Sequence, residues 1–115
     1  MTRYQVHYMR PEYFRDGIFG ASHLREVGKM PDPKNLSKTH IFLRSVAAND
    51  LEELFCYMQG DVWSPNGEAR SLIESKGLKH TSMSVGDIAI DQDTGKIYLV
   101  DTMGFEELGN ADKIR

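Results

Sequence analysis

The segment 80–87 brings an imidazole, two hydroxyls and a carboxylate within eight residues, on His80, Ser82, Ser84 and Asp87. These are the groups of a hydrolase triad, in which a carboxylate orients an imidazole that activates a hydroxyl. A triad depends on how the three side chains meet in space, and no Gly-x-Ser-x-Gly elbow surrounds either serine. In a turn, serine and aspartate side chains bond to neighbouring backbone amides instead. We therefore predict that this segment is the structural entrance to a strand and holds no catalytic residue.

A second polar segment, Trp63–Arg70, combines a flat aromatic side chain with the beginning of a predicted helix. Asn66 and Gly67 lie at the turn, where free backbone N–H groups and the positive end of a helix favour an anion. A helix capped by Ser64 explains the same residues without a ligand. A small-ligand or nucleotide pocket would lie between this turn and His80–Ser84. The predicted binding residues are Trp63, Asn66, Gly67, Arg70, His80, Ser82, Ser84 and Asp87.

The sequence predicts neither a metal ion nor a cofactor. No two of the four histidines stand at zinc-ligand spacing, and His7 and His40 meet only if their two predicted strands pair. Asp91 and Asp93 begin like a calcium loop, but Gly95 comes one position early for an EF-hand. Neither of the glycine-rich motifs that cradle phosphates is present.

Length and composition predict one domain over residues 1–115, with 40% hydrophobic and 27% charged residues. The single cysteine excludes an intramolecular disulfide, and together with the absence of a signal-peptide pattern it favours a cytoplasmic location. No apolar run approaches the roughly 18 residues that span a membrane. We therefore expect no membrane partner.

Charge is unevenly distributed around a net value of −3. Residues 1–46 contain eight Lys or Arg and four Asp or Glu, whereas residues 47–115 contain six and thirteen. Such a polar molecule suits a protein partner. It is weakly suited to duplex DNA, for which clustered Lys and Arg supply the affinity.

Hydrophobic periodicity predicts four strands. Residues 3–9 alternate apolar and polar side chains, and 39–46 are rich in β-branched and aromatic residues. Residues 88–91 and 97–100 form a hairpin around the turn Asp93–Gly95.

Two short helices are predicted between the second strand and the hairpin. The first has an apolar stripe on Leu51, Leu54, Phe55 and Met58, after a capping box that begins at Asn49 or Asp50. The second starts at Pro65 and ends before Gly77. The predicted class is α+β, with a small, mostly antiparallel sheet of about four strands and both helices on one face.

Two segments have no sustained period. Residues 10–38 are interrupted by glycine and proline, which predicts a long ordered loop with a short helical turn around His23–Glu26, attached to the core by Phe14, Ile18 and Phe19. Residues 109–115 are polar and are expected to fray.

The C-terminal third resembles a known family, the YodL-like domain. The resemblance lies in His80–Asp87, which matches a Ser-x-Ser-Val-x-Asp segment, and in Tyr98–Phe105, which matches a closing aspartate with glycine and phenylalanine. The block Trp63–Arg70 is similar to small phage and plasmid proteins that share this ending, and Leu54-Phe55 and Gln59-Gly60 fit the same pattern. The resemblance implies a bacterial mobile element and brings no catalytic mechanism with it. Residues 1–45 show no such match.

We expect a non-enzymatic binding or accessory protein that acts on a host or defence macromolecule, in the first place a protein. One alternative is a small enzyme in which His80 acts as acid or base near Ser82, Asp87 and Asp101. The other is a nucleic-acid or nucleotide binder that uses Arg3, Arg10, Arg15, Arg25, Lys29, Lys34, Lys38 and Arg44 with Tyr13, Phe14 and Trp63. The partner, the oligomeric state and the choice between 10–44 and 63–87 as the functional face stay open.

Overall fold

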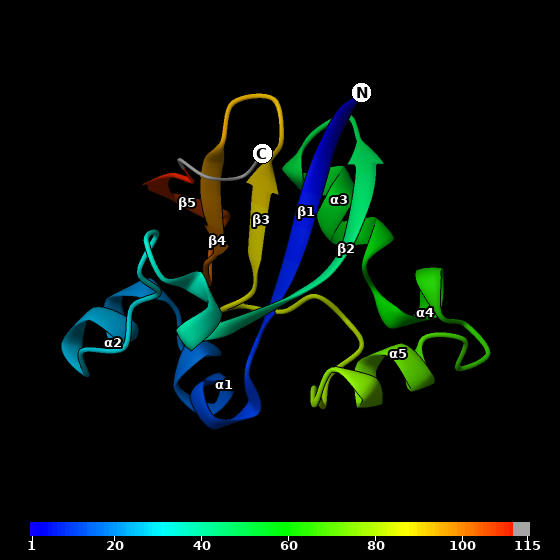
Figure 1. Cartoon of the computed structure of the whole chain (residues 1–115), viewed down its shortest axis with the longest axis horizontal. Coiled ribbons are helices and arrows are strands. Elements are labelled where there is room, and N and C mark those ends of the chain that lie inside the picture. The colour runs from blue at the N-terminus through cyan, green and yellow to red at the C-terminus, as the bar shows by residue number, and fades with distance from the viewer. Residues whose placement is uncertain (112–115) are drawn as a thin grey trace.

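A computed structural model describes residues 1–111 of the chain and shows one antiparallel sheet with short helices around it (Figure 1). The predicted α+β class is confirmed. The sheet has five strands in the order β2-β1-β3-β4-β5, and every neighbouring pair is antiparallel. The strands are β1 Thr2–Met9, β2 His40–Ala48, β3 Ile88–Asp91, β4 Lys96–Val100 and β5 Phe105–Asn110.

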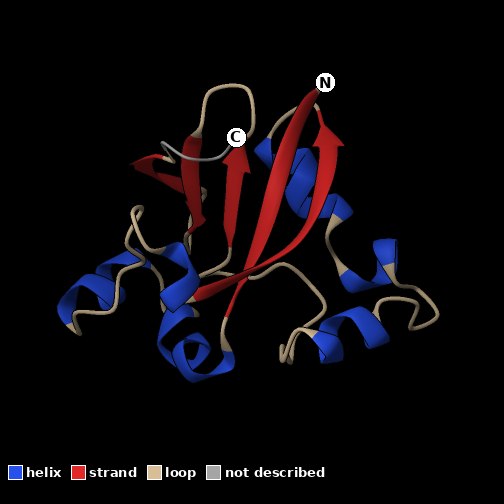
Figure 2. Ribbon diagram, in the orientation of Figure 1, coloured by secondary structure: helices blue, strands red, loops and turns tan. Residues whose placement is uncertain are grey.

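The helices are short and lie in the two long connections of the sheet (Figure 2). Between β1 and β2 the chain forms α1 Pro11–Gly17, α2 Ala21–Glu26 and the 3-10 turn η1 Leu36–Lys38. Between β2 and β3 it forms α3 Leu51–Tyr57, α4 Gly60–Trp63 and α5 Arg70–Ser75. Among residues 1–111, no helix has the length and apolar character that crossing a membrane requires.

Helices cover both faces of the sheet. The two predicted helices, now α3 and α5, pack on one face as expected, and α1 and α2 cover the other face, where no helix was predicted. Alternation along β1 turns Val6 toward one face and Met9 toward the other. The first face packs against α3 and α5 through residues such as Leu54. The second packs against α1 and α2 through residues such as Leu24.

The segment 10–38 contains two helices where a long loop with one helical turn was predicted. Helix α2 coincides with that turn, and α1 was not predicted. Pro11 occupies the first turn of α1, where its missing N–H removes no helical bond. Phe14 packs against the core of the second face, as expected. Phe19 and Ile18 do not, because their exposed fractions are 63% and 44%.

Helix α3 forms where the apolar stripe predicts it. Asp50 accepts a hydrogen bond from the Glu53 N–H at 2.8 Å, and the Glu53 carboxylate accepts one from the Asn49 N–H at 2.8 Å. The first bond is the N-cap bond of the predicted capping box, while the second reaches the N–H one residue before the N-cap. Leu54 and Met58 are fully buried.

Two elements of the C-terminal half begin elsewhere than predicted. Helix α5 begins at Arg70 instead of Pro65, since the Ser64 hydroxyl accepts from the Ala69 N–H at 2.8 Å and holds the intervening residues in a turn. Strand β5 was not predicted, because Glu106 and Glu107 break the apolar alternation. Gly109 and Asn110 belong to this strand and are not part of a frayed tail. The remainder of the predicted tail, residues 112–115, lies outside the described residues.

Candidate functional site

The carboxylate of Asp87 is the polar centre of the molecule. It is fully buried and accepts hydrogen bonds at 2.8 Å from the backbone N–H groups of Met9 and Ser84. The imidazole Nε2 of His80 lies 2.9 Å from its Oδ2 atom. Burial raises the pKa of Asp87 above its ordinary value, while His80 and the two amides act in the opposite direction. One side chain thus joins the end of β1, the 80–84 segment and the start of β3.

His80 is held between two aromatic rings. Tyr8 stacks on one side with 4.5 Å between ring centroids, and Phe14 on the other with 4.2 Å, each ring 13° from parallel. The Tyr8 hydroxyl donates to the Thr81 carbonyl at 2.7 Å, and burial raises the pKa of Tyr8. Only 14% of the His80 side chain is exposed, so both faces of the imidazole are closed to a reactant.

The two serines of this segment stabilise the backbone. The Ser82 hydroxyl accepts from the Gly60 N–H at 2.7 Å, and the Ser84 hydroxyl donates to the Ser82 carbonyl at 2.9 Å. Within residues 1–111, neither hydroxyl is hydrogen-bonded to His80. The segment therefore brings together His80, Ser84 and Asp87 without the nucleophile-to-base contact of a triad.

Gly86 lets the chain pass close to α1. Its φ is +101°, a conformation that side-chain-bearing residues rarely adopt, and a Cβ there would lie 3.1 Å from backbone atoms of Gly17. Its carbonyl accepts from Nε2 of His40 at 2.7 Å, and Nδ1 of His40 accepts from the Thr39 hydroxyl at 2.8 Å. Burial lowers the pKa of His40 to about 4, so the ring is neutral at pH 7. Nothing in the sequence spacing indicated this role for His40.

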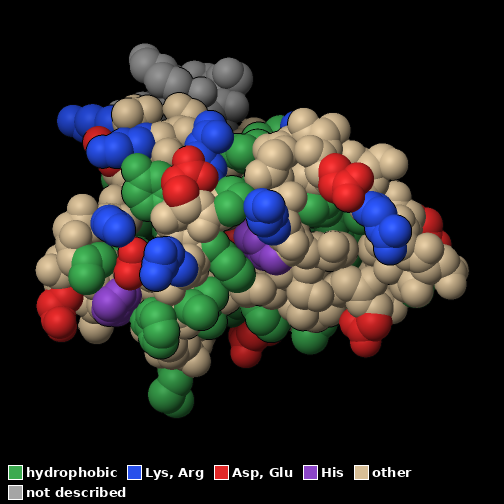
Figure 3. Space-filling view, turned by 90° about the horizontal axis from the view of Figure 1, so that it is seen from below, with side chains coloured by type: hydrophobic (Ala, Val, Ile, Leu, Met, Phe, Trp, Pro, Cys, Tyr) green, Lys and Arg blue, Asp and Glu red, His purple; other side chains and the backbone are tan. Residues whose placement is uncertain are grey.

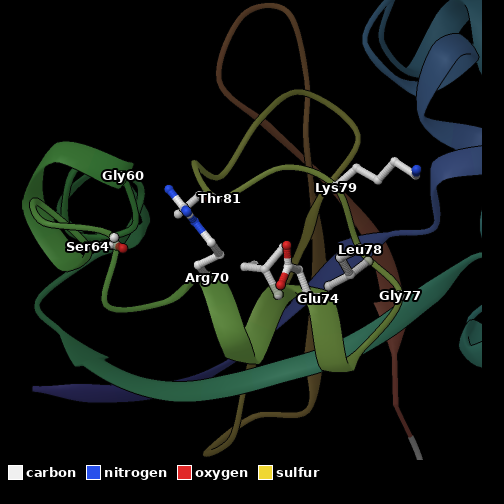
Figure 4. Close-up of a pocket in the computed structure, with 10 residues that line it drawn as sticks. Gly60, Ser64, Arg70, Glu74, Gly77, Leu78, Lys79 and Thr81 are labelled. Atoms are coloured by element: carbon white, nitrogen blue, oxygen red, sulfur yellow. The ribbon is translucent and has the colours of Figure 1, made fainter.

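A cleft of about 660 Å³ lies between the end of α4, α5 and the 77–81 segment (Figure 4). Arg70 extends from α5 toward Thr81 on one side, and Lys79 lies on the other (Figure 4). Arg70, Glu74 and Lys79 are exposed, and none of them forms an ion pair within residues 1–111. The cleft is lined by Gly60, Ser64, Gly67, Arg70, Ile73, Glu74, Gly77, Leu78, Lys79 and Thr81.

The cleft lies where a pocket was expected, between the 63–70 turn and the 80–84 segment, but it uses only part of the predicted set. Of the eight predicted binding residues, Gly67 and Arg70 line it. Glu74 and Lys79 were missed. Glu74 follows Arg70 by four positions, the spacing that places two side chains on one helical face, and this signal was available in the sequence.

Trp63 does not line the cleft. Its indole N–H donates to the Thr81 carbonyl at 3.1 Å, and the guanidinium carbon of Arg44 lies 5.0 Å from the centroid of its ring. The Asn66 N–H is bonded to the Glu68 carboxylate at 2.8 Å, and the Gly67 N–H to the Ser64 carbonyl at 3.1 Å. The amides expected to bind an anion at this turn are therefore already used.

The basic residues of the first half do not form one positive surface. Arg25 pairs with Glu106, and Lys29 lies 2.9 Å from the Asp16 carboxylate. On the face shown in Figure 3, acidic and basic side chains are interspersed. His7 and His40 do lie on paired strands, but no three His, Cys, Asp or Glu side chains gather at metal-binding distance in the described part of the chain.

Compared with protein-family models, with curated proteins and with solved structures, the chain matches none of them.

Proposed function

We propose that this protein is a non-enzymatic binding protein and that its partner is another protein, held in the cleft between α4, α5 and Leu78–Thr81. The observation that carries the proposal is the presence of three exposed charges of both signs, on Arg70, Glu74 and Lys79, around one open cleft. A polypeptide offers carboxylates and amines that complement such a mixed surface. A nucleic-acid backbone does not, because Glu74 repels its phosphates.

The site at His80 supports a binding protein over an enzyme. Its imidazole is stacked on both faces, and the hydroxyls of Ser82 and Ser84 are bonded to backbone atoms. General acid–base catalysis needs a group within hydrogen-bond reach of the reacting proton. The cleft residues include Thr81 and Lys79 but not His80.

The setting we propose is cytoplasmic, in a bacterial phage or other mobile element, with a host or defence protein as the partner. This part rests on the resemblance of residues 80–87 and 98–105 to the YodL-like domain. The structure gives those residues roles in the sheet and at the Asp87 carboxylate, so they support a shared framework more than a shared ligand site.

The experiment is a capture of partners from a bacterial lysate on the tagged protein, followed by titration of each purified candidate. The double variant Arg70→Glu, Lys79→Glu should weaken binding by about ten-fold or more, because it replaces both positive charges of the cleft. The variant Lys34→Glu, Lys38→Glu changes the net charge equally on exposed residues elsewhere and should bind like the parent protein. Equal affinity of the cleft variant and the parent would refute the proposal.

A further inference from the structure

Strand β2 is an edge of the sheet, and its pairing shows which backbone groups stay open. The Gln92 N–H donates to the Arg3 carbonyl at 3.0 Å, so Arg3 directs its backbone groups toward β3. Alternate residues of a strand bond to opposite neighbours in an antiparallel sheet. Tyr4 and Val6 therefore bond toward β2.

The partners of these two residues on β2 are Val46 and Arg44. Ser45 and Ala47, which lie next to them, then turn their N–H and C=O groups outward. Within residues 1–111, neither residue forms a backbone bond to a loop, a cap or a turn, and both are partly exposed. The outer edge of β2 thus presents the unbonded backbone N–H and C=O groups of two residues, Ser45 and Ala47.

A groove of about 340 Å³ runs beside this edge, on the face that carries α3 and α4. Tyr57 and Val62 are exposed along it, and the Arg44 guanidinium rests on Trp63 at its centre. Arg44 forms no ion pair within the described residues, so its charge is open to a ligand. Tryptophan, tyrosine and arginine are the side chains that contribute most at protein interfaces.

The other edge of the sheet, β5, is protected against pairing. It carries Glu106 and Glu107, an irregular register beside Tyr98, and Gly109 at a φ of +137°. Charges and bulges of this kind keep an edge strand from pairing with another chain. Strand β2 also has one irregularity, between Phe42 and Arg44, and one charge, on Arg44, but from Arg44 to Ala48 it pairs regularly and carries no acidic residue or proline. The contrast singles out β2 as the edge that is open to a further strand.

We propose that the outer edge of β2 binds an extended segment of a partner protein as an added antiparallel strand. One apolar side chain of that segment enters the groove between Val46 and Tyr57, and an acidic side chain meets Arg44. Main-chain bonds to Ser45 and Ala47 give affinity, and the two side chains give specificity. A second copy of this chain fits less well, because its own β2 edge offers no acidic side chain to meet Arg44.

The probe is a short synthetic peptide in which valine and glutamate alternate at every second position with serine between them, so that both can face the groove; its counterpart carries lysine in place of glutamate. We expect the acidic peptide to bind and to slow amide hydrogen exchange at Ser45 and Ala47, and the basic peptide to bind at least about ten-fold more weakly. Ser45→Pro removes an outward N–H without touching the β1 ladder and should abolish binding. Arg44→Glu should reverse the preference between the peptides, whereas Arg15→Glu on α1 should change nothing.

Several results would overturn the proposal. The first is failure of the acidic peptide to bind at about millimolar concentration. The second is unchanged amide exchange at Ser45 and Ala47 in the presence of that peptide. The third is a dimer of the chain that Ser45→Pro dissociates. If Ser45→Pro unfolds the protein, amide exchange and Arg44→Glu decide the question alone. The cleft variant Arg70→Glu, Lys79→Glu should bind the peptide normally, so this inference and the proposed function fail independently.

Discussion

The imidazole of His80 and the carboxylate of Asp87 form a buried pair, with 2.9 Å between Nε2 and Oδ2. The pair connects segments that are far apart in the sequence, because Asp87 also receives the Met9 N–H and His80 stacks on Phe14. Its geometry resembles that of an acid–base site, but its surroundings make it a structural centre. Four substitutions or conditions in and around this pair have measurable effects on stability.

Asp87→Asn should lower the free energy of unfolding by about 3 kcal/mol, since the amide places an N–H₂ group among donors that need an acceptor. Urea denaturation followed by circular dichroism measures the change. Asp93→Asn, at an exposed position of the hairpin turn, is the matched control and should cost less than about 0.5 kcal/mol. Equal effects of the two substitutions would contradict the role given to the Asp87 carboxylate.

Gly86→Ala should destabilise the protein by about 2 to 3 kcal/mol, because its Cβ meets the Gly17 backbone in addition to adopting a positive φ. Gly104→Ala isolates the cost of φ alone. Gly104 has a φ of +75° and no atom within 4 Å of a built Cβ, so we expect about 1 kcal/mol. Thermal unfolding of both variants distinguishes the two costs, and equal values would rule out a close approach of Gly17.

Acid should destabilise the fold between pH 6.5 and pH 4 through His40. Its pKa is about 4 in the folded protein and 6.5 as the ordinary value, so the unfolded chain binds more protons in this window. Stability is therefore lost as the pH falls, by up to about 3 kcal/mol from this residue. Denaturation at several pH values should show a shallower pH dependence for His40→Gln than for the parent. The raised pKa of Asp87 acts with the opposite sign and is common to both proteins.

Phe14→Leu should cost about 1 kcal/mol, because leucine keeps most of the apolar volume but loses the stacking on His80. Phe19→Leu makes the same chemical change at an exposed position and should be nearly neutral. Chemical denaturation of both variants tests the difference. A neutral Phe14→Leu would mean that the sandwich around His80 contributes no stability.

The parts of the fold that the sequence predicted are those governed by local patterns. The stripe from Leu51 to Met58, the capping box at Asp50 and the turn at Gly95 each depend on residues within a few positions of one another. Strand β5 was missed because its pairing with β4, and not its composition, makes it a strand.

In the candidate site, too, the sequence predicted what depends on local patterns and missed what depends on contacts distant in sequence. Arg70 and Gly67 were predicted from their turn, and the structure places both in the cleft. Lys79 was missed because its place there depends on how the 77–81 segment returns past α5. The open edge of β2 was also invisible, since strand order in a sheet is set by contacts distant in sequence.

The position of β1 in the middle of the sheet has a consequence for how the chain folds. Strand β1 bonds to β3, whose residues are synthesised some eighty positions later. The Met9 N–H likewise gains its acceptor, the Asp87 carboxylate, only after a similar interval. During synthesis, β1 and β2 can pair as a hairpin-like unit while the other side of β1 is still open. Pairings this distant slow folding and leave apolar strands exposed meanwhile. The growing chain is therefore most prone to aggregate before residue 91 has left the ribosome, and a chaperone that shields β1 should raise its yield.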